Sequence, residues 1–499
     1  MASYPRSRMG LILWALCPAM TSVEAAPPSP VTTRTDPAGV LLNQWYAEGK
    51  AAGHGGDFYD NRDGGHSNFD LSQYPQLKPL PYSAESREAK ENFGMAREVR
   101  SETVLGNASL SGSAVAGASI PRLYYSTREG LGFLSSQFLG NQLYIYPEHQ
   151  DHDPGGEGQS GWGDLYPTNS PYLIISQGSS GSDQPFLHAF AMTMASFTPE
   201  IKKELKEQGV LFPVIQAIFR SSLKPLKAPG DYLTGLAHPS VFPADWIDEE
   251  KMMRLAQSMT RETLPPAFRL EVIGESPPPR RGIDFFEGAG RDSESLTDQG
   301  MVIARVFRGM ARERELTVRV ARSQDSMGRP LNFEWRLLRG DPGLVRIEPS
   351  PTNEEAKITV SYQAEARPIP GMPEITSRRI DIGVFAGNGV SFSAPSFITF
   401  YFLPNERRTY DPKSGRILEV DYGFERAFVD VTLTSEKRWR DVYQYNRETG
   451  APAGWRREEP KLPAAEFDPE GRKRGVRGPM SVLYLSDPAT HVLSQLSGE

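Results

Sequence analysis

Cysteine is almost absent from this sequence, and so are long hydrophobic runs. The one cysteine, Cys17, excludes a small fold held together by several disulfide bonds. The apolar stretch at 11–20 is well short of the roughly 20 residues that a membrane-spanning helix needs. No later segment comes closer to that length, so we expect no membrane span.

An excess of positive charge is missing as well. The chain has 55 Lys and Arg against 62 Asp and Glu, which gives a formal net charge of −7. Proteins that hold a phosphate backbone need a basic surface, so nucleic acid is not expected as a partner. With 38% hydrophobic residues the chain is too apolar to be disordered throughout, and its 499 residues suit several domains.

The first residues are typical of a secretory signal peptide. Arg6 and Arg8 precede the apolar stretch, and small residues at Ala25 and Ala26 follow it. We expect segment 1–25 to be cleaved and the protein to be secreted, periplasmic or on the cell surface. The mature chain would then lack cysteine, so only core packing or bound ions could cross-link it. An uncleaved N-terminal segment is the alternative.

The next two regions differ in composition. Residues 26–81 are rich in Gly, His, Asp and Asn, and we expect them to wrap over a folded body with a short helix at 40–49. Residues 82–266 alternate apolar strands with amphipathic helices, which predicts an α/β (or α+β) domain. Within it we expect strands at 143–146 and 172–175, and helices at 184–195, 198–206, 212–223 and 245–260.

The sequence period changes after Pro265 and Pro266. Residues 267–405 contain alternating strands separated by turns, which is typical of a β-sandwich. Residues 406–499 contain three similar turns, each an aromatic residue followed by Asp or Asn and closed by Gly. We expect β-hairpins there and a partly disordered tail from Arg456 to Arg477.

One part of the sandwich resembles a known family. The run from Ala321 through Asp325 and Gly328 to Trp335 is similar to the strand, Asp/Gly turn and aromatic-x-Trp strand of PKD-type, immunoglobulin-like domains. Residues 356–360 and the strand before Asn388-Gly389 match that family's last strands. Trp335 is followed by Arg-Leu-Leu-Arg-Gly-Asp where the family has Asp-Phe-Gly-Asp-Gly. The resemblance covers about residues 267–403 and implies a spacer or adhesive module of an exported bacterial enzyme or surface protein.

Two clusters offer ligands for a divalent ion. The first directly follows the expected strand 143–146, and the second lies in a Gly-rich segment that we expect to be a loop. Carboxylates alone suit calcium, whereas carboxylates with histidine suit zinc, manganese or iron. Plain polar surface turns are the alternative for both. The candidate metal ligands are Glu148, His149, Asp151 and Asp153 in the first cluster, and Asp57, Asp60 and Asp63, flanked by His54 and His66, in the second.

A third feature is the Ser/Gly loop between the expected strand 172–175 and the helix at 184. Such a loop aims backbone N–H groups at an anion or substrate. We expect Ser179, Ser180 and Asp183 to contact substrate, although Ser182 or Asp183 could instead cap the helix. The loop lacks the P-loop pattern of nucleotide-binding proteins, so no nucleotide cofactor is expected.

These loops leave the carboxyl ends of expected strands, where ligands bind in open α/β sheets. The sequence therefore predicts one cleft, with His149 or His152 as general base or metal ligand and Asp151 as ligand or acid/base group. The function that fits is a hydrolase or other enzyme acting on an extracellular polysaccharide or surface polymer. The alternative is a non-catalytic surface or matrix protein that binds calcium and carbohydrate or protein.

Overall fold

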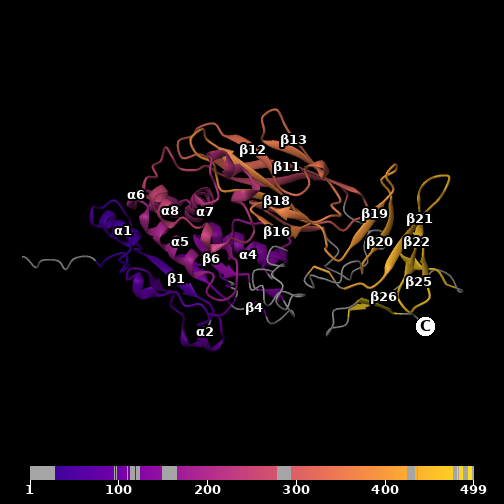
Figure 1. Ribbon diagram of the computed structural model, residues 1–499, viewed down its shortest axis with the longest axis horizontal. Coiled ribbons are helices and arrows are strands. Elements are labelled where there is room, and N and C mark those ends of the chain that lie inside the picture. Colours follow the sequence, from indigo (N-terminus) through magenta and orange to yellow (C-terminus); the bar gives the residue numbers. More distant parts are fainter. Residues whose placement is uncertain are drawn as a thin grey trace, which may run out of the picture.

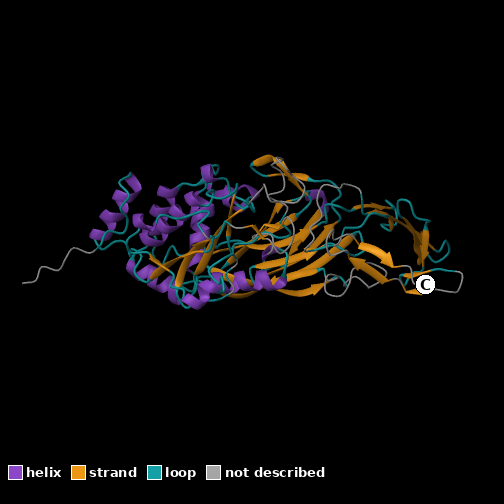
Figure 2. Cartoon of the chain, turned by 90° about the horizontal axis from the view of Figure 1, so that it is seen from below, coloured by secondary structure: helices purple, strands orange, loops and turns teal. Residues whose placement is uncertain are grey.

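The computed structural model describes residues 29–63, 65–94, 96, 98–109, 111–112, 118–119, 124–148, 166–277, 294–423, 433–434, 436–475, 480–481, 483–486 and 493–496. The expected signal peptide lies outside these residues. Figure 1 shows the α/β part at one end, an antiparallel β-rich part in the middle and a further β-sheet at the C-terminal end. Figure 2 shows the helices gathered at the N-terminal end and strands running through to the other.

Five parallel strands in the order β2-β1-β3-β6-β7 form the sheet of the α/β part. β3 and β6 are buried along their whole length, as expected for inner strands of a parallel sheet. Since all five run in one direction, their carboxyl ends meet at one edge, which we call the carboxyl edge. The bounds are β1 Asp57–Asn61, β2 Lys78–Pro79, β3 Thr103–Asn107, β6 Gln142–Pro147 and β7 Ile174–Ser176, and a separate pair is formed by β4 Ser111–Gly112 and β5 Ala118–Ser119.

The expected helices of this part are present. Thr198 caps α6 through its side chain and Asp248 caps α8. The last helix is shorter than expected because a 3₁₀ turn at Ala244–Trp246 precedes it. The bounds are α1 Pro37–Ala47, α2 Ala84–Glu88, α4 Arg128–Leu139, α5 Gln184–Ser196, α6 Pro199–Glu207, α7 Leu211–Ser222 and α8 Glu249–Gln257.

Residues 26–81 differ from the expectation of a wrapping segment. They supply β1 and β2, and β1 pairs with both β2 and β3 inside the parallel sheet. The reason is that the glycines of this segment flank β1 and do not interrupt it. The polar residues of β1 are buried because partners from other elements satisfy them, as described below. The α/β part therefore begins before residue 82.

Two sheets pack face to face in the middle part. Inward-facing residues of both sheets, among them Leu316 and Ile358 from one and Trp335 and Ile382 from the other, form one core. This confirms a β-sandwich, while membership of the PKD-type family stays a prediction. One sheet has the order β12-β17-β18-β10-β9 and the other β13-β14-β11-β8. The bounds are β8 Ala267–Glu275, β9 Ser295–Gln299, β10 Val302–Val306, β11 Glu313–Gln324, β12 Asn332–Arg339, β13 Val345–Pro349, β14 Glu355–Ser361, β17 Ile380–Gly387 and β18 Ser396–Tyr401, with a separate hairpin of β15 Arg367–Ile369 and β16 Met372–Ser377.

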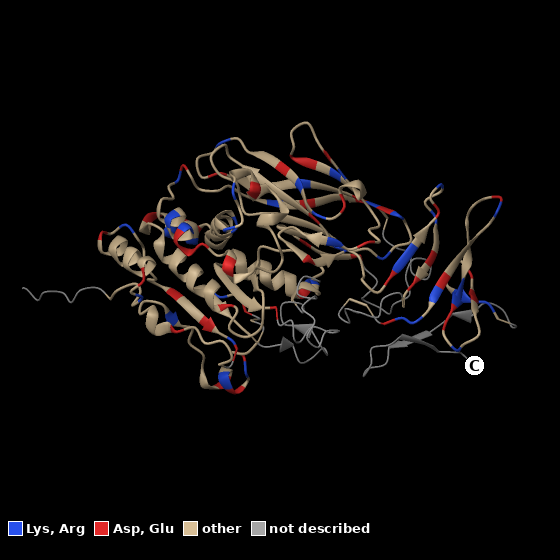
Figure 3. Ribbon diagram, viewed as in Figure 1, with Lys and Arg blue, Asp and Glu red and all other residues tan. Residues whose placement is uncertain are grey.

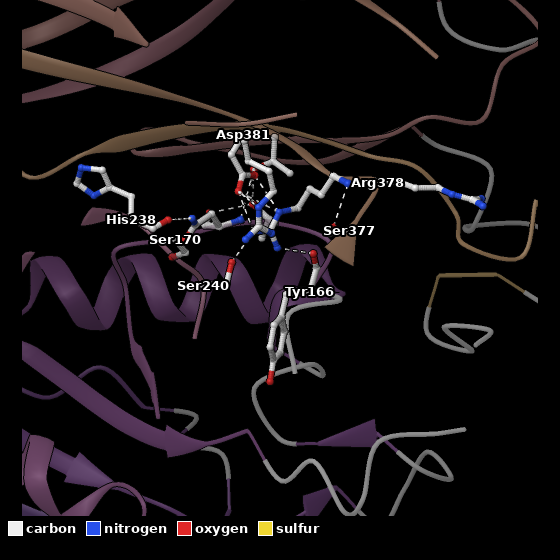
Figure 4. Close-up of polar contacts among 12 residues, drawn as sticks. Tyr166, Ser170, His238, Ser240, Ser377, Arg378 and Asp381 are labelled. Atoms are coloured by element: carbon white, nitrogen blue, oxygen red, sulfur yellow. Dashed lines mark hydrogen bonds and ion pairs between the residues drawn. The ribbon is translucent and has the colours of Figure 1, made fainter. Parts of the chain in front are cut away.

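A buried polar network joins the α/β part to the sandwich (Figure 4). The Arg379 guanidinium is fully buried, binds the Asp381 carboxylate at 2.7 Å and donates to the carbonyl oxygen of Tyr166 at 2.7 Å. Its Nη2 also donates to the Ser240 hydroxyl at 2.5 Å. The Thr399 hydroxyl completes the network by donating to Asp381. The hydrophobic core is continuous across this junction as well, so the two parts form one body.

The C-terminal sheet has the order β19-β20-β21-β22-β23-β24-β25. The three predicted turns are hairpin turns, and each closes on a glycine with positive φ, Gly415, Gly450 and Gly471. The bounds are β19 Arg407–Tyr410, β20 Ile417–Asp421, β21 Arg440–Tyr445, β22 Pro452–Glu458, β23 Ala465–Phe467, β24 Arg472–Lys473 and β25 Met480–Ser481, beside the pair β26 Leu483–Ser486 and β27 Leu493–Leu496.

The expectation of a disordered tail from Arg456 is wrong for residues 456–475, because β22, β23 and β24 lie there. Aromatic packing orders this segment despite its charge. The rings of Trp455 and Phe467 stack with centroids 5.2 Å apart, and Arg457 forms a buried ion pair with Asp441. Figure 3 shows acidic and basic residues intermixed along the described chain.

The junction predicts a large difference between two carboxylate substitutions. Asp381→Ala leaves the Arg379 guanidinium buried without its counter-charge, so we expect the free energy of unfolding to fall by about 3–5 kcal/mol. Glu271→Ala removes the exposed ion pair with Arg319 and should lower the free energy of unfolding far less, because solvent screens this pair. Urea denaturation of both variants measures this, and equal losses would contradict the assigned role of the junction.

Candidate functional site at the carboxyl edge

A network of buried polar side chains lies at the carboxyl edge, where β1 and β3 end and α5 begins. Asp63 and Asp183 are its two carboxylates, and both are fully buried. Ser67 bridges them, because its backbone N–H donates to Asp63 and its hydroxyl donates to Asp183. The network therefore connects the segment after β1 to the start of α5, which lies more than 100 residues further along the chain.

Asn107, the last residue of β3, fixes the geometry from the other side. Its amide nitrogen donates to the Asp183 carboxylate at 2.5 Å and to the Ser67 carbonyl oxygen at 2.9 Å. Its amide oxygen accepts from the Tyr59 hydroxyl at 2.5 Å. All hydrogen-bonding groups of this side-chain amide are therefore engaged, and its orientation is determined.

The electrostatics of this network are unusual. Among the described residues, no Lys, Arg or His side chain forms an ion pair with Asp63 or Asp183. Burial raises the pKa of Asp183, and the Asp63 carboxylate raises it further, while the hydrogen bonds from Ser67 and Asn107 oppose the shift. Buried carboxyl groups with raised pKa values are concentrated at functional sites.

His66 is an exposed histidine at this edge. Its Nδ1 lies 2.6 Å from the carbonyl oxygen of Asp63. A carbonyl oxygen only accepts, so Nδ1 carries a proton, and in the neutral imidazole Nε2 then has a free lone pair. The Asp63 side chain accepts from the backbone N–H groups of Gly65 and Ser67, which stiffens the turn that holds the ring. A neutral imidazole held in this way can accept a proton at Nε2.

The strands β6 and β7 contribute the second half of the edge. They are parallel neighbours, as the prediction of a single cleft requires. The N–H of Glu148 donates to the Ser176 carbonyl at 2.9 Å, and its buried carboxylate accepts from the N–H of Gly178 at 3.3 Å. Ser176 and Ser182 also share a hydrogen bond between their hydroxyls at 2.8 Å. The Ser/Gly loop is thus anchored at both ends.

The three predicted substrate contacts lie at different depths. Ser179 and Ser180 are exposed at the tip of the loop. Asp183 is fully buried beneath them, and its carboxylate binds Ser67 and Asn107. It does not cap α5, since no side-chain capping bond is formed there. The two serines are therefore available to a ligand, whereas Asp183 positions other groups.

Asp57 lies at the opposite edge of the sheet from Asp63. It begins β1, and the five residues of that strand place its two ends about 13 Å apart. Its carboxylate binds Lys202 at 2.5 Å, Lys206 at 3.2 Å and His54 at 3.3 Å. Burial alone would raise the pKa of Asp57, but Lys202 and His54 hold it well below its ordinary value. This carboxylate is the centre of a buried ion cluster.

Asp60 lies on β1 between Asp57 and Asp63, and its partners differ from those of both. Its carboxylate accepts hydrogen bonds from the hydroxyls of Tyr82 and Tyr144, each at 2.8 Å, and pairs with Arg62. The structure thus does not bring Asp57, Asp60 and Asp63 together, because they lie on and after a regular strand and not on one loop. In the part of the chain that the structure describes, no group of three or more His, Cys, Asp or Glu residues is arranged to hold a metal ion.

Four predicted site residues, His149, Asp151, His152 and Asp153, lie outside the described residues. A divalent ion at this end of β6 therefore stays a prediction, with Glu148 as the candidate ligand that the structure describes. His188 is not at the rim of the edge. Its Nδ1 shares a hydrogen bond with the Tyr74 hydroxyl at 2.7 Å, and its ring packs on Phe69.

Sequence reasoning missed Ser67 and Asn107 at this edge, and also Ser109, whose hydroxyl donates to Asp63 at 3.4 Å. These residues were missed because β3 gives no clear strand signal: it is short and has only two aliphatic residues. The signal that the sequence does contain is Gly106. The structure explains why glycine stands there, since a Cβ would lie 2.3 Å from the ring of Tyr144. A glycine that allows such close approach is typical of a strand packed under an aromatic side chain.

No model of a known protein family matches the chain, and no curated protein matches it either. Among solved structures, the chain is similar to a nucleoside hydrolase-related hypothetical protein from Saccharophagus degradans that is associated with carbohydrate metabolism. The sequence identity is 11% and the TM-score 0.20, over 60% of this chain and 71% of the other. Among the described residues, the helices are too short or too polar to cross a bilayer.

The Asp183 carboxyl predicts a specific pH dependence of stability. An acid whose pKa is raised on folding destabilises the folded state as pH rises from the unfolded pKa through the folded pKa. Asp183→Asn keeps the shape and removes this penalty, because Ser67 can accept from the new amide. We therefore expect Asp183→Asn to be at least as stable as the wild type at pH 7 and to lose that advantage at pH values below the unfolded pKa.

Asp183→Ala is the contrasting variant, since it leaves the donors of Ser67 and Asn107 buried without an acceptor. It should lose about 1–3 kcal/mol at all pH values. Urea denaturation over a pH series measures both variants. A large loss for Asp183→Asn at pH 7 would show that the native carboxylate is charged and stabilised, contrary to this assignment.

Proposed function

We propose that the protein is an exported hydrolase that cleaves an extracellular polysaccharide by acid/base chemistry at the carboxyl edge. The observation that carries the proposal is the position of His66. Its Nδ1–H is bound by the Asp63 carbonyl, and among the described residues no hydrogen bond engages Nε2. This nitrogen would accept a proton from the water that attacks the sugar carbon. The glycosidic C–O bond breaks as the new bond forms, and the proton is returned to the oxygen of the departing sugar.

The buried network gives this histidine a fixed position. The Asp63 side chain organises the 63–67 turn, and Ser67 is in turn held by Asp183 and Asn107. Asp63 and Asp183 are therefore positioning residues in the proposal, because they act through Ser67 and the turn. Positions held within a fraction of an ångström by such supporting contacts are what acid/base catalysis requires.

The substrate class follows from the exposed groups of the edge. Ser179 and Ser180 present hydroxyls, and Asn68 has an exposed side-chain amide that also binds Asn61 and the Gly65 carbonyl. Hydroxyl and amide groups that exchange hydrogen bonds with substrate hydroxyls suit a carbohydrate. The predicted signal peptide and the PKD-type resemblance favour an extracellular polymer over a small metabolite. A calcium, zinc or manganese ion bound through Glu148 and the following loop belongs to the same proposal.

The test is polysaccharide hydrolysis by His66→Gln. We expect kcat/KM for release of reducing sugar to fall about 10²- to 10⁴-fold, since the variant lacks the proton-accepting nitrogen. Initial rates on a panel of polysaccharides provide this readout.

His188→Gln is the matched control, because it makes the same substitution at a histidine whose partners are Tyr74 and Phe69. It should retain wild-type kcat/KM. Full activity of His66→Gln would refute the assignment of the base. If the wild type hydrolyses no polymer, and calcium raises its melting temperature, the chain is instead a non-catalytic, calcium-binding surface protein.

A further inference from the structure

A groove of about 600 Å³ lies where the α/β part meets the β-sandwich. Five segments line it: α7, the turn at 226–232, α8, residues 259–265 and the loop between β17 and β18. Its volume is in the range of small-molecule sites, which often lie between domains. It shares no lining residue with the carboxyl edge, so an inference about it does not depend on the proposed function.

The walls of the groove are mainly apolar. The loop between β17 and β18 leaves Val390 59% and Phe392 37% exposed on one side. Such exposure of neighbouring large apolar side chains is typical of a binding surface. The apolar residues that form the walls are Ile218, Leu226, Leu255, Met259, Val390 and Phe392.

Two ammonium groups give the groove a charge. Lys227 and Lys251 both line it, and none of the described residues that line it is Asp or Glu. The hydrogen bonds of the two ammonium groups go to backbone carbonyls, those of Lys224 and Ser221. The nearby Asp231 carboxylate is occupied by the backbone N–H groups of Lys227 and Ala228. The groove is thus apolar with a positive rim.

The loop that carries Val390 and Phe392 is preformed. The Asn388 side-chain amide donates to the Leu264 carbonyl at 3.0 Å and to Asp325 at 2.8 Å, and its oxygen accepts from the N–H groups of Val390 and Ser391. A ligand would therefore not have to order this wall, which lowers the entropic cost of binding.

We propose that this groove binds an amphipathic carboxylate, with the acyl chain along the apolar walls and the carboxylate between Lys227 and Lys251. Apolar surface leaves water on binding, and the two ammonium groups gain an anionic partner that neither has among the described residues. The charge of the rim distinguishes this ligand from a neutral or cationic amphiphile of the same length.

The experiment is isothermal titration calorimetry of the full chain with decanoate below its micelle concentration. We expect saturable binding at one site. Lys227→Gln with Lys251→Gln should weaken it at least about tenfold, the range expected for a charge-assisted contact. Decyltrimethylammonium, which has the same chain with the opposite charge, should not bind in this groove.

Val390→Asp is the decisive variant, because the residue is exposed and the new carboxylate would repel the ligand. Val40→Asp is its matched control, since Val40 is 57% exposed on α1. Loss of binding in Val390→Asp alone supports the proposal. Absence of saturable decanoate binding, equal binding of the cationic amphiphile, or equal behaviour of the two valine variants would overturn it.

Discussion

The constraint on which the rest of this structure depends is that a buried carboxylate must be matched by donors. Three such carboxylates each join segments that are distant in the sequence. Asp57 binds Lys202 and ties the first strand to α6. Asp183 binds Ser67 and Asn107 and ties α5 to the ends of β1 and β3. Asp381 binds Arg379, whose other donors reach the α/β part. Because an unmatched buried charge costs several kcal/mol, these three contacts select the arrangement of the parts as well as stabilising it.

The hydrophobic period of the sequence predicts most of the fold, and it fails where polar residues are buried. The helices α5, α6 and α7 lie where the apolar spacing places them, within one or two residues. In the sandwich β8 follows the two-residue alternation, whereas the inner strands β10, β17 and β18 are buried along their whole length. β1 is different, because Asp57, Phe58, Tyr59 and Asp60 give no apolar run, and its burial depends on Lys202 and two tyrosines from elsewhere. A local sequence pattern cannot predict contacts with residues that only the tertiary structure brings close.

The candidate site was predictable in its location and only partly in its residues. The rule that ligands bind at the carboxyl ends of parallel strands identified the loops after β6 and β7, and those strands are neighbours. The same rule could not be applied to β1 and β3, which lack a strand signal, so Ser67 and Asn107 were missed. The role proposed for His66 was beyond sequence reasoning, since it depends on a single contact of its Nδ1 with a backbone carbonyl.

The start of α5 departs from the usual local contacts of a helix N-terminus, as the proposed site would require. Asp183 stands at the position where Asp normally caps a helix, and a cap of this kind contributes about 0.5–2 kcal/mol. Its carboxylate is turned instead toward Ser67 and Asn107, so the first turn of α5 lacks that bond. The chain therefore forgoes a local contact that any capping residue could make, and keeps a buried acid whose pKa burial raises. Departures of this kind from local preference are concentrated where a protein acts on a ligand, and this one lies directly beneath the turn that holds His66.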